Sequence, residues 1–173
     1  MLRIRAAQKE DIPRISAVLA ESWKTAYRGI VSNTYLDTLK DDNWVDYLTT
    51  GMETDRNFAM VLENDDLIIG AAILGGTEIE HQVCLLSFYL LPDKIGHGFG
   101  HVFYSILENV LTEMGITSCV LNVLEENTRA IDFYAARKFI ETGENISTKL
   151  GDQAHTCIVM EKSLTHPSAP HEA

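Results

Sequence analysis

The chain has 173 residues, of which 46% are hydrophobic and 23% charged, a composition typical of a soluble globular protein with a buried core. Its net charge of −11 argues against nucleic acid as a partner, because binding a phosphate backbone requires clustered Lys and Arg side chains. No apolar run approaches the ~20 residues of a membrane span, and the N-terminus lacks the apolar core of a signal peptide. We therefore expect a cytoplasmic protein without membrane contact.

Hydrophobic periodicity and turn residues predict alternating strands and helices along the chain. The first predicted elements are a strand over 2–6, a helix after Asp11 that fails near 27–29, a helix from 32–33 through Leu39 that residues 44 and 48 could continue, a loop over 51–56, and paired strands over 58–62 and 67–74. The later ones are a strand over 83–91, a helix over 102–114, a strand over 118–124, a helix over 127–137, and a hairpin of 139–148 and 155–160. The order β-α-α-β-β-β-α-β-α-β-β implies one mixed sheet with helices on both faces, in a single α/β domain over 1–164 with a flexible tail at 165–173.

The three cysteines, Cys84, Cys119 and Cys157, are widely spaced in apolar, strand-like segments. An odd number at this spacing fits neither a disulfide framework nor a zinc motif. We expect buried free thiols.

Three alternate glycines, Gly96, Gly98 and Gly100, stand between the strand over 83–91 and the helix that follows. Glycine lets the backbone bring bare N–H groups to an oxyanion, and the N-terminus of the next helix adds about half a positive charge. The segment therefore predicts an anion site for a phosphorylated cofactor. A Walker loop and a dinucleotide fingerprint fit less well, since the chain has neither Gly-Lys-Ser/Thr nor a glycine where His101 stands.

Two sequence blocks resemble the GNAT superfamily of acetyl-CoA-dependent N-acetyltransferases, over roughly residues 2–164. Residues 88–92 followed by 96–100 are similar to the family's pyrophosphate loop, Q/R-x-x-G-x-G/A. Residues 121–123 leading to 127–134 resemble its N-x-x-A-x-x-F-Y block, about 30 residues later. The resemblance implies a mostly antiparallel sheet and direct transfer of an acetyl group from acetyl-CoA to a primary amine in a ternary complex. Relatives are frequently homodimers.

The resemblance also implies a set of coenzyme contacts. Backbone groups of Leu90 and Leu91 would pair with the pantetheine arm, and an N–H of one of them would polarise the thioester carbonyl. Tyr134 would protonate the departing thiolate, although it can also be interpreted as a core aromatic residue beside Phe133. Asn127 would contact the coenzyme, cap its helix, or do both. The other predicted contacts are Ile95, Gly96, His97, Gly98, Phe99, Gly100 and His101.

Some residues depart from the family pattern. Ile95 stands where Gln or Arg is preferred, so a phosphate contact there must come from backbone N–H groups. Lys138 replaces the Gly that usually precedes Phe139, and a left-handed backbone at Lys138 would be strained. His97 and His101 could pair on a metal, but no third ligand is evident, so we expect no metal and either a contact at the phosphate rim or solvated side chains.

The general base is the weakest prediction. Cys84 occupies a position where many relatives carry Glu, and direct transfer gives its thiol no role as a nucleophile. Glu80 is predicted as the base, with Glu78 and His81 as alternatives. All three can equally be solvated loop residues.

The acceptor side of the cleft in relatives corresponds to the region that contains Trp23, Tyr27 and Tyr35. These aromatic residues either anchor the core or contact a cationic amine. We expect a small-molecule or peptide amine as acceptor, and the acidic charge mildly favours a small cation. A non-catalytic acyl-CoA-binding module and transfer of a longer acyl group are the alternatives.

Overall fold

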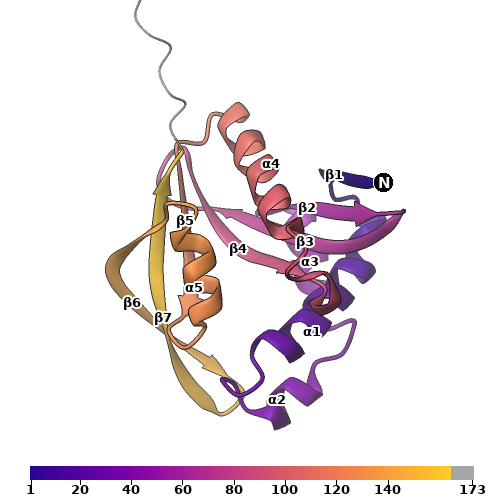
Figure 1. The fold of residues 1–173 in the computed structure, drawn as a ribbon, viewed down its shortest axis with the longest axis vertical. Helices are drawn as coiled ribbons and strands as arrows, with labels where there is room; N and C mark the ends of the chain where they lie inside the picture. Colours follow the sequence, from indigo (N-terminus) through magenta and orange to yellow (C-terminus); the bar gives the residue numbers. More distant parts are fainter. Residues whose placement is uncertain (165–173) are drawn as a thin grey trace, which may run out of the picture.

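The structure is a computed structural model that describes residues 1–164, and a seven-stranded sheet runs through it (Figure 1). The strand order is β1-β2-β3-β4-β5-β7-β6, and only the β4–β5 pair is parallel, which confirms the predicted mixed, mostly antiparallel sheet. The strands are β1 (Leu2–Ala6), β2 (Asn57–Asn64), β3 (Leu67–Gly76), β4 (Gln82–Leu90), β5 (Ser118–Leu124), β6 (Ile140–Leu150) and β7 (Gln153–Ser163). The α-helices are α1 (Ile12–Ala26), α2 (Asn33–Thr38), α3 (Val45–Glu53), α4 (Phe99–Glu113) and α5 (Thr128–Ala135).

The helix predicted from 32–33 through Leu39 is observed as α2, but residues 44 and 48 do not continue it, because a separate helix, α3, begins at Val45. Leu39 ends α2 in an extended conformation, and the polar residues 40–43 form a turn. Such residues offer the backbone alternative hydrogen bonds and favour turns over helix interiors. The Trp44 N–H then donates to the Ser16 hydroxyl of α1 at 3.0 Å, which ties the turn to the core.

Other element boundaries differ by a few residues. Helix α4 begins at Phe99, earlier than predicted, directly after Gly98 in the left-handed conformation. Helix α3 continues into the segment 51–53 that was expected to be loop. The predicted flexible tail, 165–173, lies outside the described residues. Within 1–164 no helix is both long and apolar enough to cross a membrane.

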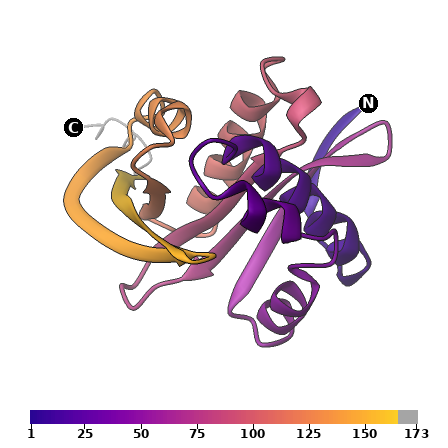
Figure 2. The same cartoon turned by 90° about the horizontal axis from the view of Figure 1, so that it is seen from below.

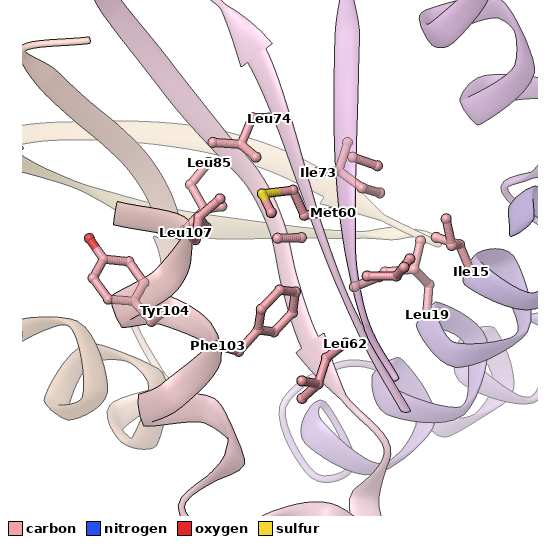
Figure 3. Packing of buried hydrophobic residues seen from close by; sticks show 14 of the residues in the cluster. Ile15, Leu19, Met60, Leu62, Ile73, Leu74, Leu85, Phe103, Tyr104 and Leu107 are labelled. Atoms are coloured by element: carbon pink, nitrogen blue, oxygen red, sulfur yellow. The ribbon is translucent and has the colours of Figure 1, made fainter. Parts of the chain in front are cut away.

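The hydrophobic core lies on both faces of the central strands (Figure 3). Phe103 and Leu107 of α4 pack on one face, and Ile15 and Leu19 of α1 lie across the strands from them, all at most 1% exposed. Since successive strand side chains point to opposite faces, the continuous apolar run of β3 serves both layers. This confirms the predicted helices on both faces of the sheet.

Strands β4 and β5 pair only at their beginnings, Gln82–Cys84 with Ser118–Val120. A register shift against β3 leaves Leu86 as an extra residue in β4, and such a bulge bends its strand. Figure 1 shows β4 and β5 separating, with α5 beside the opening. Figure 2 shows the β6–β7 hairpin curving around the side of the molecule opposite the N-terminus. The edge of β4 that faces β5 is therefore unpaired where the strand approaches the glycine loop.

Candidate active site

A cavity of about 520 Å³ lies where β4 and β5 separate. It is lined by the end of β4, the glycine loop, the last turns of α1 and one face of α5. Of the predicted coenzyme contacts, the structure brings these to the cavity wall: Leu90, Ile95, Gly96, Gly98, Gly100, His101, Asn127 and Tyr134. Residues of the glycine-loop block and of the block around 127–134 therefore line the same cavity.

The glycine loop has the backbone geometry of an anion site. Gly96 and Gly98 have φ of 88° and 80°, the left-handed region that side chains rarely adopt, and a Cβ at either would meet open space. A Cβ at Gly100 would lie 3.4 Å from the side chains of Leu90 and Phe133. No side chain caps α4, so its first N–H groups are free to bind an anion. These residues fit the phosphates of a nucleotide coenzyme.

The end of β4 offers one free backbone N–H to the cavity. The N–H of Leu91 donates to the carbonyl of Ile69 in β3 at 2.8 Å, so it is occupied. Successive N–H groups of a strand point to opposite edges, and the N–H of Leu90 therefore faces away from β3, toward the opening. The Leu90 carbonyl, on the same edge of β4 as its N–H, accepts a hydrogen bond from the Ser22 hydroxyl at 2.9 Å. This geometry favours Leu90 over Leu91 for the oxyanion contact.

Tyr134 lies in the cavity wall on α5. Its ring is packed edge-on against Phe133 and Phe139, with centroids 5.4 and 5.6 Å away. Desolvation raises the pKa of its hydroxyl well above the ordinary value, and the nearby Tyr27 hydroxyl raises it further. The phenol therefore keeps its proton at neutral pH. The interpretation as core residue and the interpretation as acid are compatible.

Asn127 also has two compatible roles. Its Oδ1 accepts the N–H of Ala130 at 3.2 Å, which makes it the N-cap of α5. The residue lines the cavity as well. The cap fixes the start of the helix that carries Tyr134.

Arg137 lines the cavity, and the sequence analysis did not identify it. Its guanidinium lies 3.4 Å from the ring centroid of Phe133 and donates to the Phe133 carbonyl at 2.8 Å. Its Nη2 is 3.2 Å from Nδ1 of His101, in the first turn of α4. The available signal was spacing, since Arg137 follows Phe133 by four residues and Tyr134 by three, on one helical face. Arg137 thus supplies positive charge that Ile95 does not.

Several predicted site residues do not reach the cavity wall. Leu91 is buried, His97 is exposed in the loop, and Phe99 is half-buried at the start of α4. Glu80, the predicted base, lies in the turn before β4 with its side chain 89% exposed. Leu90 is the last residue of the nine-residue strand β4, which follows this turn, so Glu80 and Leu90 lie roughly 30 Å apart at ~3.3 Å per residue. The structure therefore does not bring Glu80 to the other site residues.

The aromatic residues predicted to bind the acceptor are not among the residues that line the cavity. Tyr27 is 8% exposed, and its hydroxyl shares a 2.7 Å hydrogen bond with the hydroxyl of Tyr89. Trp23 packs edge-on against Tyr27 at 4.7 Å, and Tyr35 lies against the turn at Gly151. From this region of the chain, Ser22, Thr25, Ala26 and Ile30 line the cavity instead.

The cysteines and histidines form no metal site in the described part of the chain, where no three His, Cys, Asp or Glu side chains cluster suitably. Cys119 and Cys157 are buried free thiols, as expected, and Cys84 is half-buried. Desolvation raises the pKa of the Cys84 thiol, so it stays protonated and poorly nucleophilic at neutral pH.

Comparison with known proteins now identifies the family. The chain is 25% identical over 169 residues to a spermidine N(1)-acetyltransferase of Thermoplasma acidophilum, covering 93% of this chain and 96% of the relative. It is 27% identical over 143 residues to YuaI of Bacillus subtilis, an uncharacterised N-acetyltransferase, covering 79% of each chain. The crystal structure of the PaiA N-acetyltransferase from T. acidophilum in complex with coenzyme A superposes with a TM-score of 0.73 at 24% identity, covering 94% of this chain and 99% of that one.

The model of the acetyltransferase (GNAT) family matches residues 17–139, well over half of the chain. This match confirms the predicted family and enzyme class, an acyltransferase that uses acetyl-CoA. The protein belongs to the GNAT family of acetyltransferases.

Proposed function

We propose that the protein moves an acetyl group from acetyl-CoA to the nitrogen of a small primary amine, by direct attack in a ternary complex. One observation carries the proposal. The unpaired edge of β4 ends at a free Leu90 N–H, in the same cavity as the glycine loop and the protonated hydroxyl of Tyr134.

Acetyl-CoA would be held mainly by the glycine loop and the N-terminus of α4. The amides around Gly96, Gly98 and Gly100 donate to phosphate oxygens, and each hydrogen bond to a charged group is worth about 1.5–3 kcal/mol. Arg137, held against Phe133 and beside His101, adds the cation of the site. The unpaired edge of β4 is free to receive the amide-bearing arm of the coenzyme as an additional strand would be received.

When bound, the coenzyme supplies an activated thioester. The Leu90 N–H donates a hydrogen bond to the oxygen on which negative charge develops. The Tyr134 hydroxyl holds the proton that the leaving sulfur requires. Both groups sit on regular elements, β4 and α5, and the Asn127 cap fixes the second of these.

The acceptor is proposed to be a small cation of the polyamine kind. The chain carries a net charge of −11, and Glu126 places a carboxylate in the cavity wall. The similarity to a spermidine N(1)-acetyltransferase agrees with this choice. The cytoplasmic location, the homodimer and the absence of nucleic acid as a partner remain predictions.

The test has two steps on the purified protein. Calorimetry should detect binding of coenzyme A, and a thiol assay should detect coenzyme release from acetyl-CoA with at least one amine in a panel of polyamines, amino acids and peptides. Coenzyme binding without release by any amine would favour the acyl-CoA-binding module. No coenzyme binding at all would refute both, and faster release from longer acyl-CoAs would reassign the donor.

A further inference from the structure

His155 of β7 is a buried imidazole that the proposed function leaves without a role. Its side chain is 6% exposed, and its Nε2 has no hydrogen-bond partner among the described residues. A buried polar atom without a partner costs about as much as a lost hydrogen bond, and such atoms are few in native proteins. This cost calls for an explanation.

The other ring nitrogen of His155 faces the cavity wall. Nδ1 lies 3.9 Å from Oε1 of Glu126, in the connection between β5 and α5. Among the cavity-lining residues of the described chain, Glu126 is the one acidic side chain. It is 47% exposed, so its carboxylate is free to rotate between the cavity and the imidazole.

Neighbouring residues show the same closeness of Glu126 to β7. His155 and Cys157 are two residues apart on a regular strand and therefore share a face, and Cys157 packs with Tyr27 and Leu124. Burial raises the pKa of the Cys157 thiol, and the carboxylates of Glu126 and Glu125 raise it further.

A carboxylate alone is a poor base for an alkylammonium ion. With ordinary pKa values near 10.4 for the amine and 4.3 for a glutamate, the transfer is unfavourable by about 10⁶. An imidazole is ordinarily a stronger base than a carboxylate, so an imidazole as the final acceptor makes the proton transfer less unfavourable. A carboxylate that meets the amine and an imidazole behind it together form a more effective base.

We propose that Glu126 receives the ammonium group of the acceptor and takes its proton, and that His155, with its own proton on Nε2, accepts the proton from the carboxylate at Nδ1. The N–H bond of the ammonium breaks, its proton moves to a carboxylate oxygen of Glu126 and then to Nδ1 of His155. The products of this step are a neutral amine, a carboxylate and an imidazolium. Glu126 is the catalytic residue and His155 the positioning residue, in a role that rests on the proposed function.

The test compares Glu126→Gln and His155→Gln with a matched control, Glu125→Gln, whose side chain lies outside the cavity wall. Spermidine is the first acceptor, replaced by the best amine of the panel if the wild type does not use it. Glu126→Gln should lower kcat/KM by about 10²–10⁴, the usual size of acid–base catalysis. His155→Gln should lower kcat about 10- to 100-fold with little change in KM. Both variants should bind coenzyme A as the wild type does.

Two readouts separate this role from a structural one. The pH profile of kcat/KM should differ from that of the wild type in His155→Gln and match it in the control; Glu125, Lys149 and Cys157 are further titratable groups near His155. The ring-proton NMR signals of His155 should shift when spermidine is added to the wild type, and stay in place in Glu126→Gln.

Each outcome decides the proposal. Wild-type rates in Glu126→Gln and His155→Gln would overturn it and leave the proposed function intact. A wild type that releases coenzyme with no amine would refute the proposed function and this inference with it. If His155→Gln fails to fold, the rate of Glu126→Gln, a change at a half-exposed side chain, and the NMR shift of His155 still test the proposal.

Discussion

Replacing Arg137 by Met tests whether a side chain compensates for Ile95 at the phosphates. Met keeps an apolar stem over Phe133 but removes the guanidinium, which now contacts the Phe133 carbonyl at 2.8 Å and His101 at 3.2 Å. One lost hydrogen bond to a charged partner costs about 1.5–3 kcal/mol. At about 1.4 kcal/mol per tenfold change, the Kd for coenzyme A should rise roughly 10- to 150-fold.

Calorimetric titration with coenzyme A at low and high salt measures the effect. The wild type should lose affinity as salt rises, and Arg137→Met should lose less, because a screened cation–phosphate contact is already absent. Arg137→Lys should fall between the two, since it keeps the charge without the planar fork. Arg3→Met, at an exposed position of β1, is the control. A folded Arg137→Met protein with the wild-type Kd and salt dependence would refute the assignment.

Three further predictions follow from single positions. Lys138 has a φ of 72°, so Lys138→Gly should relieve backbone strain and raise the free energy of unfolding by about 1 kcal/mol. In a thermal melt this raises Tm by about 2–4 °C, whereas Lys138→Ala should leave Tm no higher than that of the wild type. Gly98→Val forces a branched side chain into a left-handed position at the anion site, so calorimetry should show no coenzyme binding by a protein that still melts cooperatively, and retained affinity would contradict the loop assignment. Tyr134→Phe should lower kcat by about 10²–10⁴ without changing the affinity for coenzyme A, and an unchanged kcat would exclude the acid role. Because burial raises the pKa of Tyr134, the wild-type rate should not fall through ionisation of this group below the ordinary tyrosine value near 10.

The sequence predicted the elements that local patterns determine. The glycines at 96 and 98 were expected to let the backbone turn toward an anion, and both adopt the left-handed conformation; Asn127 caps α5, as its position before a helix suggested. Lys138 adopts the left-handed conformation expected where relatives have Gly. In each case the chemistry of one residue and its neighbours is sufficient.

The rest depends on tertiary contacts that spacing does not encode. The break between α2 and α3 is stabilised by Ser16 of α1, far away in sequence. The pairing of Leu91 with β3, which leaves Leu90 as the free donor, follows from strand register. Glu80 precedes β4 in sequence, but the length of the strand carries it away from the site, while Glu126 and His155 meet only because β5 and β7 are neighbours in the sheet.

The central claim is that the acetyl group ends on an amine nitrogen. Isotope-labelled acetyl-CoA, purified protein and an excess of spermidine, or of the best amine in the panel, should yield an N-acetylated amine that carries the label, detected by mass spectrometry, together with free coenzyme A. Coenzyme that binds tightly while its label stays on the thioester, or appears only as free acetate, would contradict the claim.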